Sequence, residues 1–171
     1  LMKNEYNFTF KKKKYTLRFK KSKDNYRYDY QLYLGKDKIK CKTESSTRIV
    51  LIPKDLDFVI KINDFYSEVI DGSIKIDDLS NQNLIEFKKY KKINLKDKRY
   101  FAKPLKYIKE HEFDILIQKK ITEFDKYKNE KCYEFMFNKM QKLTTKYQLH
   151  DIHDQNYIVT IKGFKIIDYA I

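Results

Sequence analysis

The chain has 171 residues, 42% of them hydrophobic, which is enough to bury the core of one domain or of two small lobes. Only 3 Gly and 2 Pro occur, so the composition excludes a disordered or low-complexity protein. No apolar run approaches the ~20 residues of a membrane-spanning helix, and the first residues lack the hydrophobic region of a signal peptide. We therefore expect a soluble, folded protein of the cytoplasm.

Basic residues dominate the charge, because 38 Lys and Arg stand against 24 Asp and Glu and give a net charge of +14. Such a field attracts nucleic acid, anionic membranes, acidic proteins and nucleotides alike. The abundance of Lys, Asn and Ile is also typical of an AT-rich genome, so the charge alone does not assign a nucleic-acid site. Cys41 and Cys132 match neither a zinc-ligand spacing nor a disulfide framework, which favours a reducing compartment.

The first third of the chain has the alternation of antiparallel strands. Residues 6–20 alternate apolar and polar side chains on both sides of four consecutive lysines, which predicts a hairpin with one buried face. Further strands are expected at 28–34, 48–52 and 57–62, the last two separated by a turn that contains Pro53. We expect one lysine-rich antiparallel sheet, whose charged turn is solvated and protects the sheet edge.

A helix is predicted over residues 80–92, followed by extended segments at 103–108 and 112–121. Ser80 is the expected N-cap. The helix has an apolar stripe with lysines opposite, which is typical of a helix that packs on a core. The stripe consists of Leu84, Phe87 and Tyr90.

A second helix over residues 129–148 shows the strongest amphipathic pattern of the chain. Its apolar residues at helical spacing, which we expect in the core, are Tyr133, Met136, Phe137, Met140, Leu143 and Tyr147. A polar loop and a final hairpin follow, and the hairpin is expected to turn at Lys162 and Gly163. The fold class is therefore α+β.

The polar loop LHDIHDQN gathers two of the three histidines of the chain. One hypothesis is a zinc or manganese cluster of His150, Asp151, His153 and Asp154, since histidines three apart fit one helical face. The loop, however, follows a completed helix and precedes a strand, and no further ligand motif occurs elsewhere. The pattern therefore favours a functional loop without a metal cluster of this kind.

The order FVIKI, a helix with a glutamate, DIHDQN and KIIDYA resembles the protein kinases and their kinase-like relatives in phages, viruses and bacteria. The resemblance implies that Lys61 holds the α and β phosphates of a nucleotide and that Glu86 is its ion-pair partner. By the same resemblance Asp151 is the catalytic base, Asn156 binds a metal and Asp168 chelates magnesium. ATP and Mg²⁺ are the implied cofactors.

Two further segments take part in the implied nucleotide site. The hinge would fall at Gln118 to Ile121, where main-chain groups would meet the adenine ring. The segment that replaces the glycine-rich loop of the family has no glycine, so Ser45, Ser46 and Thr47 would offer N–H groups or hydroxyls to phosphate. Ala170 also stands where the family has a glycine.

The fold implied by the resemblance is kinase-like, with an antiparallel N-lobe sheet and one αC-like helix. The expected boundaries are 1–121 for this N-lobe and 122–171 for a C-lobe that carries the long helix, the catalytic-type loop and the hairpin. The sequence ends three residues after Asp168, so the expected C-lobe is truncated and lacks an activation segment. The resemblance begins near residue 38.

Two functions fit these features. The first is a minimal phosphotransferase that uses ATP and Mg²⁺ to phosphorylate a Ser, Thr or Tyr hydroxyl of a protein, in the cytoplasm of a bacterial or infected host cell. The second is a catalytically weak or inactive kinase-like binding protein, phage-encoded and directed against a host defence, whose basic surface binds a protein or nucleic acid. The retained polar residues favour the enzyme, whereas the truncation and the glycine-free loop favour the binding protein.

Overall fold

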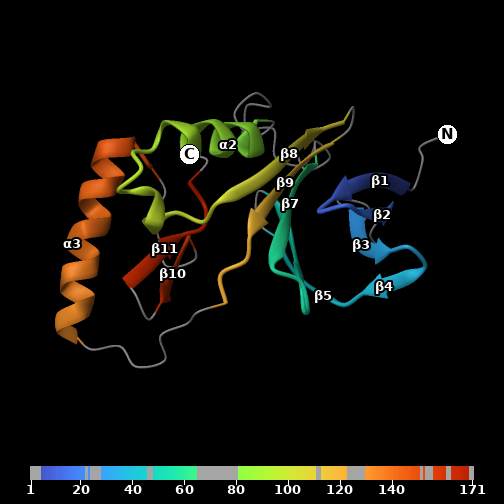
Figure 1. Ribbon diagram of the computed structural model, residues 1–171, viewed down its shortest axis with the longest axis horizontal. Helices are drawn as coiled ribbons and strands as arrows, with labels where there is room; N and C mark the ends of the chain where they lie inside the picture. The colour runs from blue at the N-terminus through green and yellow to red at the C-terminus, as the bar shows by residue number, and fades with distance from the viewer. Residues whose placement is uncertain are drawn as a thin grey trace.

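The computed structural model describes residues 5–21, 23, 28–45, 48–64, 81–110, 113–122, 130–150, 152, 156–160 and 163–169 (Figure 1). The strands within these ranges are β1 (Glu5–Phe10), β2 (Lys13–Lys21), β3 (Tyr28–Leu34), β4 (Asp37–Ile39), β5 (Cys41–Ser45), β6 (Ile49–Pro53), β7 (Phe58–Asp64), β8 (Pro104–Lys109), β9 (Phe113–Lys119), β10 (Tyr157–Thr160) and β11 (Gly163–Ile166). The helical elements are α2 (Gln82–Lys92), the 3-10 turn η2 (Lys98–Tyr100) and α3 (Glu130–Tyr147).

The strands form antiparallel sheets with the orders β1-β2-β3-β4, β5-β6-β7-β9-β8 and β10-β11. The expectation of a single sheet in the first third is wrong, because the sheet ends after β4 and a second one begins at β5. Lys40 stands between them outside any strand. Alternation reports which face of a strand is buried but not which strand it pairs with, and the central pairing of β7 with β9 joins residues about 55 positions apart.

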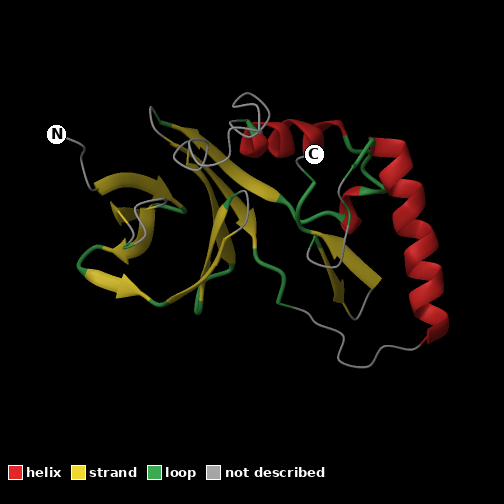
Figure 2. Ribbon diagram, turned by 180° about the vertical axis from the view of Figure 1, so that it is seen from behind, coloured by secondary structure: helices red, strands yellow, loops and turns green. Residues whose placement is uncertain are grey.

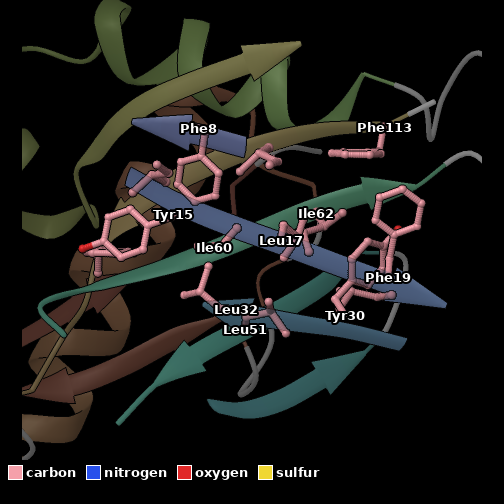
Figure 3. Packing of buried hydrophobic residues seen from close by; sticks show 14 residues of the cluster. Phe8, Tyr15, Leu17, Phe19, Tyr30, Leu32, Leu51, Ile60, Ile62 and Phe113 are labelled. Carbon is pink, nitrogen blue, oxygen red and sulfur yellow. The ribbon is translucent and has the colours of Figure 1, made fainter. Parts of the chain in front are cut away.

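The core between the first two sheets is rich in aromatic rings (Figure 3). In β2 the alternate residues Tyr15, Leu17 and Phe19 are buried, as the period-2 pattern predicts. Rings meet edge to face across the two sheets, with Tyr15 and Phe58 5.7 Å apart and Phe19 and Phe113 5.6 Å apart between centroids. The N-terminal sheet therefore covers the outer face of the five-stranded sheet.

Helix α2 packs against β7, β8 and β9, but its most buried residues are not those of the stripe that the sequence predicts. Its buried residues are Gln82, Asn83 and Glu86, whereas Leu84, Phe87 and Tyr90 are only partly buried. The stripe still makes contacts, since Phe87 stacks on Tyr107 of β8 at 6.0 Å between ring centroids. The polar residues are the more buried ones because the surface under α2 carries polar side chains that bind them. Asn81 is the N-cap and makes no side-chain capping bond, and Ser80 lies outside the described residues.

A second hydrophobic cluster joins α3 and the β10-β11 hairpin to the segment after α2, and Figure 2 shows α3 standing beyond this hairpin. Met140 and Leu143 of α3 are buried as predicted, but Phe137 is 50% exposed. The side chain of Tyr133 lies outside the described residues. Because this cluster also includes Ile93 and Phe101, it draws on both sides of the predicted boundary at 121/122, which stays a prediction.

The final hairpin, β10-β11, closes at Thr160 and Gly163. Thr160 pairs with Gly163, so Gly163 belongs to strand β11 and not to the turn predicted at Lys162 and Gly163, and Lys162 lies outside the described residues. Gly163 has φ +127, a conformation that favours glycine.

The amide of Ala102 donates to the Ile166 carbonyl over 2.8 Å, and the Tyr169 hydroxyl donates to the Ala102 carbonyl over 2.7 Å. The chain end that carries Asp168 is thereby fixed beside the five-stranded sheet.

In the part of the chain that the structure describes, neither helix is both long and apolar enough to cross a membrane.

Candidate functional site

Lys61 lies in β7, a central strand of the five-stranded sheet. Its neighbours Ile60 and Ile62 face the aromatic core, so alternation turns the Lys61 side chain to the opposite face, toward α2. The Lys61 ammonium lies 2.6 Å from Oε1 of Glu86 and also donates to the Ile167 carbonyl. The ion pair expected between Lys61 and Glu86 is therefore present in the structure, and both side chains are buried.

The Glu86 carboxylate accepts hydrogen bonds from donors on separate strands and loops. Lys61 and Gln118 both donate to Oε1, each over 2.6 Å, and Arg48 donates through Nη2 to Oε2 over 2.7 Å. Glu86 is 0% exposed. A carboxylate buried to this extent is stable only with such partners, so the polar face of α2 is explained by the cations beneath it.

Arg48 is a residue of the candidate site that the sequence does not predict. It immediately precedes β6 and is only 2% exposed, although it is a long cationic side chain. Its Nη2 lies 2.5 Å from Oδ1 of Asp168 as well as 2.7 Å from Glu86, so one guanidinium joins the two carboxylates. Arginine is rare in this lysine-rich chain, and its occurrence at the start of the strand predicted over 48–52 was the available signal.

The buried charges alter each other's proton affinity. Burial lowers the pKa of the Lys61 ammonium; Glu86 opposes this shift and the neighbouring Arg48 adds to it. Burial also acts to lower the pKa of Arg48, but Glu86 and Asp168 outweigh it, so that pKa is raised. Lys61, Arg48, Glu86 and Asp168 together form a neutral cluster of two cations and two anions, which we call the charge cluster.

Asn83 and Asp114 support the charge cluster from the side. The amide of Asn83 donates to Oδ1 of Asp114 over 2.7 Å and to the Lys61 carbonyl over 3.0 Å, and its oxygen accepts from Arg48 over 2.9 Å. The Tyr107 hydroxyl donates to the other oxygen of Asp114 over 3.0 Å. Burial raises the pKa of Asp114, while the bonds from Asn83 and Tyr107 act in the opposite direction.

Asn156 and Asp168, the predicted metal ligands, are close in the structure. The Asn156 carbonyl accepts the amides of Ile167 over 2.8 Å and of Asp168 over 3.3 Å. The Asp168 side chain is 34% exposed, more than Arg48, Lys61 or Glu86. Carboxylate and amide oxygens are the ligands that Mg²⁺ prefers, so their chemistry fits the ion, although Arg48 holds one Asp168 oxygen. Among the described residues no group of three or more His, Cys, Asp or Glu is placed to hold a metal.

Several predicted site residues are not tested by the structure. Asp151, Ser46 and Thr47 lie outside the described residues, as do His153 and Asp154 of the alternative metal cluster. Ser45 is the exposed last residue of β5 and pairs with Ile49.

Gln118 is buried in β9 opposite Val59, and its side chain donates to Glu86. At the expected hinge the Lys119 amide donates to the Lys103 carbonyl over 2.8 Å, and the Lys120 amide donates to the Asp57 carbonyl over 2.9 Å. The adenine contact at the hinge stays a prediction.

The sequence matches no protein-family model and no curated protein. Among solved structures the chain is similar to WbdD, in its co-crystal structure with the kinase inhibitor LY294002, with a TM-score of 0.53 and 12% identity. The match covers 82% of this chain and 34% of the WbdD chain, so the chain spans about a third of that protein. This likeness supports a kinase-like fold with antiparallel sheets and carries nothing on substrate or catalysis.

Proposed function

We propose that the chain is a kinase-like phosphotransferase that binds ATP beside Lys61 and transfers the terminal phosphoryl group to a hydroxyl of a protein. The observation that supports this proposal is the ion pair of 2.6 Å between Lys61 and Glu86, with Asp168 joined to the same carboxylate through Arg48. Three chain segments far apart in sequence thus bring together the lysine, glutamate and aspartate that the resemblance to kinases singles out.

Phosphoryl transfer requires cationic groups at the phosphates and accurate placement of the reacting oxygens, with little covalent work by the protein. Lys61 supplies a cation whose position is fixed by Glu86 and by the Ile167 carbonyl. Asp168 and Asn156 would hold Mg²⁺, which supplies further positive charge to the phosphates when bound. Asp151 would orient the acceptor hydroxyl, as the resemblance implies.

The test is incubation of the purified chain with γ-labelled ATP and Mg²⁺, alone and with a general protein acceptor. Label should enter the chain or the acceptor, and Lys61→Met, Asp151→Asn and Asp168→Asn should each reduce the rate by at least about 100-fold, or roughly 2.7 kcal/mol in the barrier. Lys42→Met is the matched control, because Lys42 is an exposed lysine whose ion pair is with the exposed Glu44 on its own strand. Circular dichroism confirms that each variant is folded.

Transfer that survives all three substitutions would contradict the proposed site. Absence of transfer in the wild-type chain, together with the absence of any ATP-induced shift in melting temperature, would contradict the proposed activity.

A kinase-like binding protein without transfer is the second candidate. It is favoured by the 2.5 Å contact of Arg48 with Asp168, since this contact occupies an oxygen that a metal would need. The net charge of +14 would then attract an anionic partner. If that partner is a nucleic acid, its affinity should fall steeply with added salt, whereas a protein partner held by apolar contacts should be far less sensitive.

A further inference from the structure

We infer that Arg48 is a built-in counterion of Asp168, which occupies this carboxylate in the metal-free protein and competes with a divalent cation for it. The inference rests on the proposed function, because it concerns the same site. It assigns to Arg48 a positioning role that the resemblance to kinases does not supply.

The geometry fixes the Arg48 guanidinium on two sides. Nη1 donates to Oδ1 of Asn83 over 2.9 Å, and Nη2 donates to Oε2 of Glu86 over 2.7 Å, so α2 holds the group from one side. Asp168 accepts from Nη2 over 2.5 Å on the other side. Because guanidinium offers several donors in a rigid plane, these contacts hold it in one orientation.

Charge explains why the site needs Arg48. Without it Lys61 alone would face Glu86 and Asp168, which leaves one negative charge in excess in a largely buried cluster. An uncompensated charge is unfavourable away from water. Arg48 therefore provides, in the metal-free protein, the positive charge that a divalent cation would bring to Asp168.

Displacement of Arg48 from Asp168 leaves the other described contacts of Arg48 in place. Arg48 would keep its bonds to Asn83 and Glu86, and Glu86 would keep those from Lys61 and Gln118. A cation that binds Asp168 therefore competes with the charge-assisted hydrogen bond from Arg48, whose contacts with α2 do not oppose the exchange. The contact between Arg48 and Asp168 thus stabilises the fold without metal and, at the same time, weakens the affinity of Asp168 for a metal ion.

The first experiment measures melting temperatures in EDTA, without nucleotide. Asp168→Asn should lower the melting temperature by about 3 °C or more, because Arg48 loses its carboxylate. Asp57→Asn is the matched control, since Asp57 has the same 2.5 Å contact with a cation, Lys11, but is 67% exposed; it should change the melting temperature far less. If Asp168 only binds a metal, Asp168→Asn should melt in EDTA at the same temperature as the wild type or higher. That result would overturn the inference.

The second experiment titrates Mn²⁺ into wild-type protein and Arg48→Lys by calorimetry, again without nucleotide. Lysine keeps the charge but lacks the planar fork that reaches Asn83, Glu86 and Asp168 together. The variant should therefore bind Mn²⁺ at least about threefold more tightly, because its hold on Asp168 is weaker. Equal or weaker Mn²⁺ binding by the folded variant, or no Mn²⁺ binding by either protein, would contradict the inference that Arg48 competes with the cation for Asp168. Failure of phosphoryl transfer with both expected results intact would contradict the proposed function alone.

Discussion

Lys61 and Glu86 form an ion pair of 2.6 Å in which both side chains are buried, and this pair ties helix α2 to the centre of the five-stranded sheet. Glu86 also holds Arg48, and through it Asp168 at the end of the chain. One carboxylate thus positions groups from β7, from the residue before β6 and, through Arg48, from the segment after β11. The stability of this arrangement depends on every member having its partner.

Glu86→Gln should lower the free energy of unfolding by about 3–5 kcal/mol, because it leaves buried cations at Lys61 and Arg48 without their shared carboxylate. Urea denaturation monitored by circular dichroism measures the change. Glu44→Gln is the control, since Glu44 has a comparable ion pair of 2.7 Å with Lys42 but is 52% exposed. Similar losses in both variants would show that burial of the Glu86 pair is not the cause.

Asn83→Leu should lower the free energy of unfolding by about 3 kcal/mol, because leucine keeps the volume but leaves buried polar partners unsatisfied. Those partners are the Arg48 guanidinium, the Lys61 carbonyl, and the carboxylate and main-chain carbonyl of Asp114. Asn7→Leu is the control, because Asn7 is exposed and accepts a hydrogen bond from the Thr16 hydroxyl on the neighbouring strand. A stability within error of the wild type would contradict the network proposed around Asn83.

Leu32→Ala tests whether the first two sheets share one core. Leu32 of β3 is 0% exposed within the aromatic cluster that joins the two sheets. Its truncation should lower the free energy of unfolding by about 2–5 kcal/mol and keep a single unfolding transition. Leu95→Ala, at a position 86% exposed, should stay within about 0.5 kcal/mol of the wild type. A second, separate transition for the N-terminal sheet would contradict a shared core.

Asp97 predicts a dependence of stability on pH. Hydrogen bonds from Lys146 over 2.7 Å and Tyr147 over 2.6 Å lower its pKa below the ordinary 3.8. Since the folded pKa is the lower one, this carboxylate stabilises the fold above pH 3.8, and the contribution is lost as pH falls through the lowered value. Asp97→Asn should therefore be less stable than the wild type at pH 7, and the difference should shrink as the pH falls below 3.8 and through the lowered pKa of Asp97. A difference in stability that does not change as the pH is lowered below 3.8, measured by thermal unfolding, would contradict this assignment.

The sequence predicts most of the strands because alternation is a local property. The hairpin of β1 and β2, the strand β3 and the strand that carries Lys61 all follow from it. Pairing is not local, and so the division into two sheets after β4 is not predictable from alternation.

The candidate site was predictable only in part. Lys61, Glu86 and Asp168 follow from the resemblance to kinases, and the structure brings them together through Arg48. Arg48 itself belongs to no motif, and its neighbours in space lie 35 to 120 positions away. Glu86 resembles a solvated helix carboxylate in sequence, since its partners come from three other segments.

The most direct test of the kinase-like site is a calorimetric titration of ATP into the wild-type chain and Lys61→Met, each with and without Mg²⁺. The account predicts that the wild type binds ATP and that Lys61→Met, verified as folded, binds it at least about tenfold more weakly, or 1.4 kcal/mol. No binding by the wild type under either condition, or equal affinity of the two proteins, would contradict a nucleotide site built on Lys61 and Glu86.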